Sequence, residues 1–464
     1  MQQLTKSTTG LWLFVFSLFA LVSCKKDLDS NEAEQQAILT SAAKVNGHLK
    51  QTKTYSADVA LKWLHLQMQI LRLSGATPQT PAANPYSLNG NRNFAYLGVA
   101  LYEAVVPGMP SYQSLSGQLT DMPKMPETEP GKAYHWPTSA NAALAFLTTN
   151  FYAAAPAMHK QAMLDLENSL QTEYRQQTDA AIFERSNAFG LEVAKRIFAW
   201  AQEDGSQKLY DPWVAPSDPT KWSNTAPNPT GVSAPFWGLN RAFVPGSFNN
   251  TASPPPPAYS TDPNSAYYKM VKEVYDISQT LTDEQKATAL YFRDNPGFQA
   301  GTNYQFTFTQ IMHDENPQLD ELAVAQAKVG IILADAQINC WKIKYTLLVD
   351  RPIRYIRNVL GHTTWNSFLA MPPHPDFPSG HSQTGGAFAA AMTSLLGDNY
   401  HFTLHTYDIL NMAPRPYKSF NEMADDIGQS RVYGGIHYTY SCVEGIKQGS
   451  RIAANILTTL RFQK

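Results

Sequence analysis

The stretch HPDFPSGHSQTGGAFAAAMTSLL, residues 374–396, joins a proline-rich turn to a run of small and apolar residues. The second part predicts a buried helix that begins near His381. The first backbone N–H groups of a helix lack partners and carry a partial positive charge, so Ser379, Gly380 and His381 would face an oxyanion. On its own, the pattern fits an ordinary turn and helix cap better than a catalytic element.

Two cations precede this stretch in WKIKYTLLVDRPIR, residues 341–354. Lys344 and Arg351 are seven residues apart, which is about two turns of an α-helix, so both would point the same way on a helix that ends near Pro352. A pair of cations that face one way needs an anion. For this pair in isolation, a solvated charged face is the simpler explanation.

A third cluster, SRVYGGIH at residues 430–437, contains Arg431 and His437. A spacing of six residues would turn the two side chains to different faces of a continuous helix. Gly434 and Gly435 can interrupt that helix and let the two side chains converge. Considered singly, His437 would be an ordinary core or surface histidine.

Taken together, the three clusters resemble the tripartite signature of the superfamily of type 2 phosphatidic acid phosphatases and vanadium haloperoxidases. The resemblance covers residues 341–445 and rests on Lys344, Arg351, Pro352, Pro378, Ser379, Gly380, His381, Ser430, Arg431 and His437. It implies an all-α protein, a helical bundle with long ordered loops around one oxyanion pocket.

The resemblance also implies a role for each side chain. The three cations of the signature would neutralise the equatorial oxygens of a tetrahedral or trigonal-bipyramidal oxyanion, as charge-assisted hydrogen bonds favour in a dry pocket. The Ser379 hydroxyl and the Gly380 N–H group would donate further hydrogen bonds. His381 would be the acid–base group, and His437 would supply the axial nitrogen.

Two chemistries occur on this scaffold. In a haloperoxidase, His437 would hold vanadate, and hydrogen peroxide would oxidise a halide, bromide or iodide in preference, to hypohalous acid, which reacts with an organic acceptor. In an acid phosphatase, which needs no vanadate, His437 would attack the phosphorus of a phosphate ester and form a phosphohistidine, while His381 protonates the leaving alcohol. A non-catalytic lipoprotein that binds oxyanions is the third hypothesis.

Position 441 departs from the phosphatase motif, which continues to an aspartate four residues after the histidine. This chain has Ser441 there, and Glu444 one turn further on could substitute. The departure weakens the phosphatase interpretation, although many haloperoxidases also carry that aspartate.

Two aromatic residues favour the haloperoxidase. Trp341 stands where haloperoxidases resemble one another in having a tryptophan beside the vanadate pocket, with an ordinary core aromatic as the alternative. His374 stands where bromide-oxidising members have a histidine, with an exposed loop histidine as the alternative. Both residues are candidates for the halide site.

Carboxylates outside the clusters are weaker candidates. Asp294 in YFRDNPG could be a partner of Arg431 or His437, although a surface or capping role is the simpler explanation. Glu422, Asp425 and Asp426 precede the third cluster on an expected helix, where a solvated placement is the default.

The N-terminus has the features of an export signal. An apolar run of ten residues, LWLFVFSLFA at 11–20, precedes LVSC at 21–24, which resembles a bacterial lipobox. We expect a signal peptide at 1–23, lipidation of Cys24 and a flexible tether at 24–50. The chain would then be attached to a bacterial membrane through its lipid anchor only. Lys25 and Lys26 weakly favour the outer membrane, and an ordinary signal peptide or short anchor is the alternative.

Composition limits the other function classes. The 36 Lys and Arg residues nearly balance the 38 Asp and Glu residues, which gives no reason to expect a nucleic-acid partner or an acidic membrane surface. Besides Cys24, the chain has Cys340 and Cys442, whose spacing resembles no zinc or iron site. Export permits a disulfide between them, which the sequence alone does not establish.

Helical periodicity extends over much of the remaining chain, at about 55–75, 93–106, 139–152, 158–202, 267–281, 282–293 and 320–345, and no strand pattern persists. Residues 205–262 are instead rich in proline, asparagine, serine and tryptophan, which predicts a long ordered loop packed on the body. Within a body at 51–464, this loop would separate an N-terminal helical part at 51–204 from a catalytic part at 263–464. We expect one body rather than two independently folding domains.

Overall fold

The computed structural model describes residues 50–72, 89–224, 231–294 and 303–464. The expected signal peptide, Cys24 and almost all of the tether lie outside these residues. None of the described helices is both long and apolar enough to cross a membrane.

Helices dominate the described residues, and the predicted all-α class is confirmed. The α-helices are α2 (Asp58–Leu71), α3 (Asn89–Val105), α4 (Trp136–Phe151), α5 (Ala157–Gln177), α6 (Ala180–Gln202), α7 (Ala266–Gln279), α8 (Asp283–Tyr291), α9 (Asn303–Glu315), α10 (Leu319–Leu347), α11 (Pro352–Asn358), α12 (Gly380–Leu396), α13 (Phe420–Tyr433) and α14 (Thr439–Thr459). Four short 3₁₀ helices accompany them: η1 (Thr52–Thr54), η3 (Val106–Gly108), η4 (Trp237–Leu239) and η5 (Asp408–Leu410).

Two local expectations were wrong. The periodicity at 158–202 is divided between α5 and α6, because Thr178 adopts an extended backbone between them. A small antiparallel ribbon also occurs, in which β1 (Phe402–Leu404) pairs with β2 (Arg415–Tyr417) and Phe402 lies opposite Tyr417. Strands of three residues are too short to leave an alternating pattern in the sequence.

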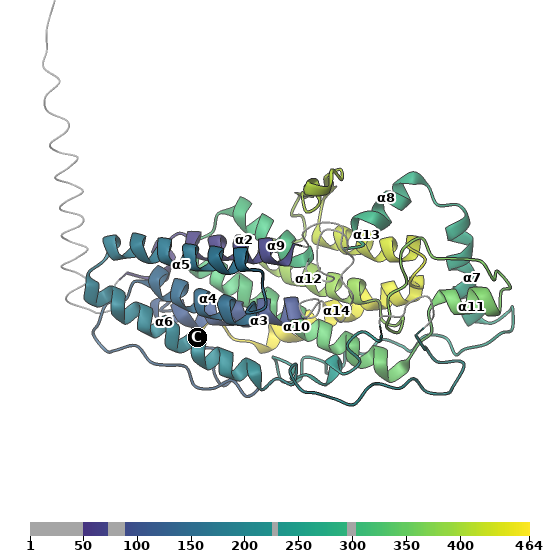
Figure 1. The fold of residues 1–464 in the computed structure, drawn as a ribbon, viewed down its shortest axis with the longest axis horizontal. Coiled ribbons are helices and arrows are strands. Elements are labelled where there is room, and N and C mark those ends of the chain that lie inside the picture. Colours follow the sequence, from purple (N-terminus) through teal and green to yellow (C-terminus); the bar gives the residue numbers. More distant parts are fainter. Residues whose placement is uncertain (1–49, 73–88, 225–230, 295–302) are drawn as a thin grey trace, which may run out of the picture.

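The helices are arranged in an elongated body (Figure 1). Helices α2 to α6 and α9 occupy one end, α7, α8 and α11 occupy the other, and α12, α13 and α14 lie between them. The 29-residue helix α10 packs on α3 and on α12 and so connects the early helices with the late ones. The C-terminus returns to the early helices, where the Lys464 N–H group donates to the Ser111 carbonyl at 3.0 Å.

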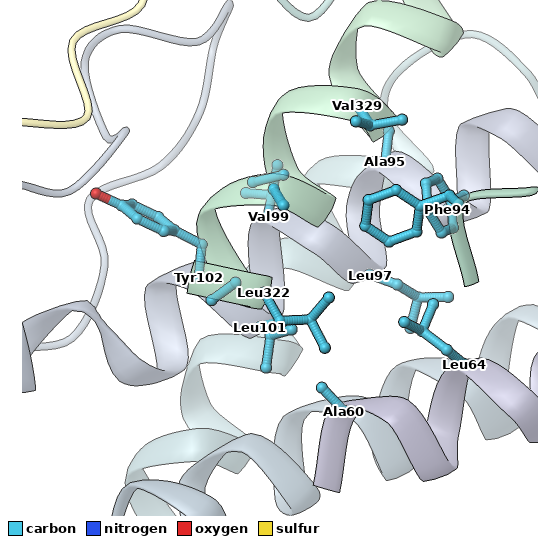
Figure 2. Close-up of a cluster of buried hydrophobic side chains, with 14 of the residues drawn as sticks. Ala60, Leu64, Phe94, Ala95, Leu97, Val99, Leu101, Tyr102, Leu322 and Val329 are labelled. Carbon is cyan, nitrogen blue, oxygen red and sulfur yellow. The ribbon is translucent and has the colours of Figure 1, made fainter. Parts of the chain in front are cut away.

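The core beneath α10 is apolar and closely packed. Figure 2 shows Leu64 of α2, Leu97 and Leu101 of α3, and Leu322 of α10 in one buried cluster. Buried apolar side chains from residue 57 to residue 462 belong to this same cluster, so the early and late helices share one core.

Glycines allow α3 and α10 to approach each other closely. A Cβ atom on Gly98 would lie 2.7 Å from the Gln326 carbonyl oxygen, and one on Gly330 would lie 2.7 Å from the Cα atom of Ala95. Real Cβ atoms essentially never make such contacts. The two helices can therefore pack at this distance only because both positions lack a side chain.

A buried carboxylate fastens the long loop to α10. Asp335 accepts hydrogen bonds from the backbone N–H groups of Phe243 at 2.6 Å and Val244 at 3.1 Å. Trp222 and Trp237 of the same loop are buried. In its described part, the loop is therefore packed on the body that carries the three sequence clusters.

Candidate active site

The helix that carries the first cluster ends earlier than expected. Helix α10 ends at Leu347, Leu348 adopts a left-handed conformation with φ 52°, and Arg351 is the extended N-cap residue of α11. The prediction that Lys344 and Arg351 share one helix was therefore wrong. The chain turns back after Leu348, and both side chains reach the same region from two different elements.

Lys344 and Arg351 are both buried and are held by backbone carbonyls. Lys344 Nζ donates to the carbonyls of Pro375 at 2.7 Å and Asp376 at 2.8 Å. Arg351 Nε donates to the His374 carbonyl at 2.9 Å, and Arg351 Nη1 donates to the Ile436 carbonyl. Burial lowers the pKa of Lys344 to about 8 and that of Arg351 to about 10, so both cations occupy a site with little water.

The second cluster forms the start of α12. Helix α12 begins at Gly380, next to the expected position, and the Ser379 hydroxyl caps it by accepting from the Ser382 N–H group at 3.4 Å. Ser379 is fully buried, whereas His381 remains partly exposed. The local turn and cap are therefore real, and they set the direction of His381.

Asp294 is the partner of His381. Its Oδ2 atom lies 2.6 Å from His381 Nε2, and the residue is buried with a left-handed backbone at φ 68°. The favoured interpretation of Asp294 as a surface carboxylate was therefore wrong, and so was the alternative that it pairs with His437, which has Asp376 beside it. Among the described residues, Arg431 forms no ion pair, although Asp294 raises its pKa against the stronger, lowering effect of burial.

The third cluster converges through its two glycines. Helix α13 ends at Tyr433, and Gly435 follows with φ 71°. Arg431 and His437 are both buried, and both line one cavity. Arg431 Nε donates to the Ser430 hydroxyl at 3.1 Å.

Asp376 is the site residue that the sequence patterns missed. His437 Nδ1 lies 2.8 Å from Asp376 Oδ1, Ser441 Oγ donates to Oδ2, and the carboxylate is fully buried. The sequence did contain an indication of this role. Asp376 is a carboxylate two residues after His374, and position 441, where the phosphatase motif has an aspartate, is a serine. The combination of these two facts could have identified it.

The remaining carboxylates lie away from His437. Glu444 pairs with Lys447 at 2.9 Å and does not replace the missing aspartate. Glu422 caps the start of α13 through the Lys418 N–H group, and Asp426 accepts from the Tyr417 hydroxyl at 2.6 Å. Burial raises the pKa of Asp425. Cys340 and Cys442 are both buried and both free, so the permitted disulfide is not formed.

The three clusters surround a cavity of about 430 Å³. Six residues of the predicted set line it directly: Trp341, His374, Gly380, His381, Arg431 and His437. Lys344, Arg351 and Ser379 are not among the lining residues. Arg351 contacts the lining residues His437 and His374, whereas Lys344 is held by the carbonyls of Pro375 and Asp376.

Both halide-site candidates face this cavity. The rings of Trp341 and His374 lie 5.4 Å apart, and His374 Nδ1 lies 3.0 Å from Arg351 Nη2. Burial, reinforced by Lys344 and Arg351, lowers the pKa of His374 well below its usual range. His374 is therefore neutral and packed into the site, and the exposed-loop alternative is wrong.

The donor set fits an oxyanion such as vanadate. The site contains three buried cations, Lys344, Arg351 and Arg431, and they outnumber its two buried carboxylates, Asp294 and Asp376. The cavity therefore carries excess positive charge. Burial and the neighbouring cations lower the pKa of His437 well below its usual range, so its imidazole is neutral. Because Nδ1 faces a carboxylate, we assign the proton to Nδ1, which leaves a lone pair on Nε2.

A bare metal cation has no comparable site. Within the described ranges, no group of three or more His, Cys, Asp or Glu side chains is arranged to hold a metal ion. With vanadate in the cavity, His437 Nε2 would be the ligand, and the cations together with the Gly380 N–H group would face the oxygens.

Known proteins resemble this chain in the same region. Residues 325–463 match the family model of the VCPO second helical-bundle domain. A structure described as the first bacterial vanadium-dependent iodoperoxidase is similar with a TM-score of 0.76 and 28% identity, over 88% of this chain and 98% of that one. No curated protein matches the chain in sequence.

A bacterial vanadium-dependent chloroperoxidase has the same fold. Its holo and apo structures each match with a TM-score of 0.64 and 16% identity, over 87% of this chain and 98% of that chain. At this identity, the likeness concerns the fold alone.

Proposed function

Because the chain belongs to the superfamily of vanadium haloperoxidases and type 2 phosphatidic acid phosphatases, we propose that it is a vanadate-dependent haloperoxidase. It oxidises a halide with hydrogen peroxide to hypohalous acid, with iodide and bromide as the favoured halides. The observation that carries this proposal is a neutral His437, whose Nε2 lone pair lies 3.0 Å from Arg351 Nη1, on a cavity that Arg431 also lines.

The cations bind and orient the cofactor. Vanadate, when bound, supplies a Lewis-acidic centre that activates hydrogen peroxide toward a halide. Arg431 neutralises oxyanion charge from the cavity wall, and Lys344 and Arg351 do so from behind it. Backbone carbonyls hold Lys344 and Arg351 in place before the anion enters, so the positive charge beside the cavity is preorganised.

His381 moves protons at the open side of the site. Its Nε2 atom is held 2.6 Å from Asp294 Oδ2, and its ring lines the cavity with about a fifth of the side chain exposed. Asp294 fixes the ring orientation and stabilises the imidazolium when the ring accepts a proton. His381 can therefore accept a proton from hydrogen peroxide and return it to the departing oxygen.

His374 and Trp341 form the wall on which we propose that the halide selectivity rests. Their rings face the cavity together, and His374 is held by Arg351. Replacement of His374 by phenylalanine changes a polar wall into an apolar one. The ratio of bromide to chloride turnover in this variant tests the proposal, and an unchanged ratio contradicts it.

We also propose that the chain is exported and lipid-anchored through Cys24. The support is the LVSC sequence after an apolar run. Metabolic labelling with palmitate should mark the wild-type chain and leave Cys24→Ser unmarked. Equal labelling of both chains contradicts the anchor.

The central experiment uses the purified chain from Lys25 onward. It is incubated with orthovanadate and assayed for peroxide-dependent oxidation of iodide, bromide and chloride, and separately for hydrolysis of a chromogenic phosphate ester. We expect halide oxidation that His437→Ala abolishes and that the exposed control His401→Ala retains. Ester hydrolysis that vanadate inhibits, without halide oxidation, overturns the proposal in favour of a phosphatase. Oxyanion binding without either reaction indicates a non-catalytic protein.

A further inference from the structure

One buried carboxylate receives donors from a single turn of the chain. Asp376 accepts from His437 Nδ1 at 2.8 Å, from the Ser441 hydroxyl, and from the Tyr438 backbone N–H group. All three donors lie within residues 437–441, whereas Asp376 lies 61 residues before His437. We propose that Asp376 is the positioning residue of His437, and that Ser441 holds Asp376 in place.

The backbone of Asp376 is fixed before any ligand enters. Its N–H group donates to the Val349 carbonyl at 2.9 Å, and its carbonyl accepts from Lys344 Nζ at 2.8 Å. The backbone of Asp376 therefore cannot move away from His437 without the loss of these two contacts, and the Ser441 hydroxyl holds the carboxylate itself. This constraint gives His437 one ring orientation and one tautomer.

A counter-ion role toward Arg351 explains less of the geometry. Arg351 Nη1 lies 4.0 Å from Asp376 Oδ1, which is farther than the 2.8 Å to His437 Nδ1. The nearest groups to Arg351 are instead the carbonyls of His374 and Ile436. The two carboxylate oxygens of Asp376 accept hydrogen bonds from the imidazole and from the Ser441 hydroxyl. The main role of Asp376 is therefore to orient the ring of His437.

The geometry also explains why position 441 carries a serine. Ser441 Oγ and His437 Nδ1 contact opposite oxygens of one carboxylate. A carboxylate at position 441 would therefore extend into the space that Asp376 now fills. One acid fits between the two positions, and in this chain it comes from residue 376.

The test exchanges the carboxylate and the hydroxyl between positions 376 and 441. Orthovanadate and inorganic phosphate are titrated by calorimetry into wild type, Asp376→Ser, Ser441→Asp and the double variant Asp376→Ser/Ser441→Asp. We expect Asp376→Ser to weaken vanadate binding by about 10- to 100-fold, as the loss of groups that orient a ligand does. The double variant should recover at least about tenfold of that loss.

Three results overturn the inference. They are wild-type vanadate affinity in Asp376→Ser, no recovery in a folded double variant, and recovery in the Ser441→Asp variant alone. Near-ultraviolet circular dichroism checks the folded state, and Asp376→Asn, which keeps the side-chain size, replaces Asp376→Ser if the latter does not fold. This inference rests on oxyanion binding and not on halide oxidation, so a failure of the proposed function leaves the titration interpretable.

A second inference concerns the apolar lining of the cavity. Apolar side chains line it together with the polar ones, among them Leu290, Phe368, Leu369 and Ile436. Phe368 is 41% exposed, which marks the opening of the cavity. The volume of about 430 Å³ is within the range of sites for small organic molecules.

Arg293 adds a cation to this apolar wall. Its side chain lines the cavity, and its Nε atom is buried without a hydrogen-bond partner. It belongs to none of the three clusters, and in the described part of the chain it forms no ion pair, so its charge is available to a ligand. We infer that this part of the cavity binds an organic acceptor with an apolar or aromatic body and a carboxylate that pairs with Arg293.

The reaction at this place is halogen transfer, and it rests on the proposed function. A ring carbon of the acceptor forms a bond to the halogen of hypohalous acid while the oxygen–halogen bond breaks. The ring proton and the released hydroxide leave as water. Binding in the same cavity lets the acceptor meet hypohalous acid before it diffuses into solvent.

A matched pair of phenols tests this inference. Iodination of 4-hydroxyphenylacetate and of tyrosol, the corresponding neutral alcohol, is measured in wild type and in Arg293→Gln. Each rate is divided by the rate of iodide oxidation by the same protein. We expect saturation with the acid, a kcat/KM about tenfold higher than for the alcohol, and a ratio near one in Arg293→Gln, because the charge-assisted pair is lost.

Two results contradict the acceptor site. The first is iodination that does not depend on acceptor concentration, which indicates reaction in free solution. The second is a preference for the acid that survives in Arg293→Gln. Absence of iodide oxidation is a failure of the proposed function instead, and the normalising assay identifies it.

Discussion

Helix α10 belongs to two regions of opposite character. Near its start it packs on α3 through Gly98 and Gly330, and the surrounding side chains are apolar (Figure 2). Near its end it carries Lys344 to the region of the cavity, where Arg351 and Arg431 are also buried. The first region stabilises the fold by apolar burial and close packing, whereas the second opposes it by the desolvation of charge.

The contrast between these two regions shows that different residues provide the stability of the fold and the binding of a ligand. Burial lowers the pKa of each of the three cations, which means that the folded site disfavours their charge. A bound oxyanion would reverse that effect. The α3–α10 contact has no such need for a ligand, so changes in the two regions should have different signatures.

The largest expected effect is a loss of activity without a loss of stability. Arg431→Met removes a buried cation that has no ion pair in the described structure and replaces it with an apolar side chain. Halide oxidation should fall by about 10²- to 10³-fold, because one preorganised electrostatic contact is lost. The midpoint of thermal unfolding should stay equal or rise.

The control for Arg431→Met is Arg451→Met on α14. Arg451 donates to the Thr251 carbonyl at 3.0 Å and lies outside the cavity lining. This variant should keep its activity and lose some stability. If Arg431→Met unfolds more readily than Arg451→Met, the division between the two regions is wrong.

The next effect is a pH dependence of stability that comes from the scaffold. Burial raises the pKa of Asp335 to about 7 in the folded chain, above an unfolded value of about 4. Between these values the folded state retains a proton that the unfolded state has released, so the free energy of unfolding falls as pH rises from about 4 to about 7. The shift of about three pKa units sets an upper limit of about 4 kcal/mol.

Asp335→Asn should remove this slope. Asparagine keeps the oxygen that accepts from the Phe243 N–H group but does not titrate. Denaturant unfolding at a series of pH values from about 4 to about 7 measures the slope in both proteins. A slope that persists in Asp335→Asn assigns the titration to another group, such as Glu103, whose pKa burial also raises to about 7.

A smaller effect is expected at the α3–α10 contact. Gly330→Val places branched carbons where a Cβ atom alone would already be 2.7 Å from Ala95. The free energy of unfolding should fall by about 2–3 kcal/mol, as overpacking of a core does. Halide oxidation per folded molecule should stay unchanged.

Ala180→Val is the matched control for Gly330→Val. Ala180 is an exposed residue at the start of α6, so valine there changes helix propensity without a packing conflict. Its cost should stay below about 1 kcal/mol. If Gly330→Val lowers activity per folded molecule, the packing contact and the site are coupled, and the comparison needs revision.

The sequence predicted the residues of the site better than the residues that hold them in position. The resemblance of the three clusters to a known signature indicated the convergence of His381, Arg431 and His437, and Gly434 and Gly435 supply the turn that brings the last two together. The pairing of Asp376 with His437 joins positions 61 residues apart, and only the folded chain brings them together. No local pattern carries that information.

Helix ends show the same limit. Helix α10 ends at Leu347, although the sequence contains no helix-breaking residue before Pro352. Tertiary contacts, and not a local sequence signal, account for the left-handed backbone of Leu348. In contrast, the break between α5 and α6 had a signal in Thr178 and Asp179, since such residues often precede helices. The apolar periodicity on both sides obscured it.

The smallest effect concerns α8, which leads into Asp294. Thr282 and Gln285 form a reciprocal cap at its start, with the Gln285 N–H group 3.2 Å from the Thr282 hydroxyl. Thr282→Ala should lower the free energy of unfolding by about 1 kcal/mol. Ser265→Ala, which removes a similar cap from α7, is the matched control and should cost about the same.

Neither cap variant should change halide oxidation more than about twofold. The C-terminal end of α8 is held separately, because the Phe292 N–H group donates to the Thr288 carbonyl at 3.3 Å and Asp294 is fixed by His381. Loosening of the first turn should therefore not reach the acid–base pair. A tenfold loss of activity in Thr282→Ala, but not in Ser265→Ala, would mean that α8 positions Asp294 mechanically. In that case the boundary between scaffold and site lies at Thr282 rather than at Asp294.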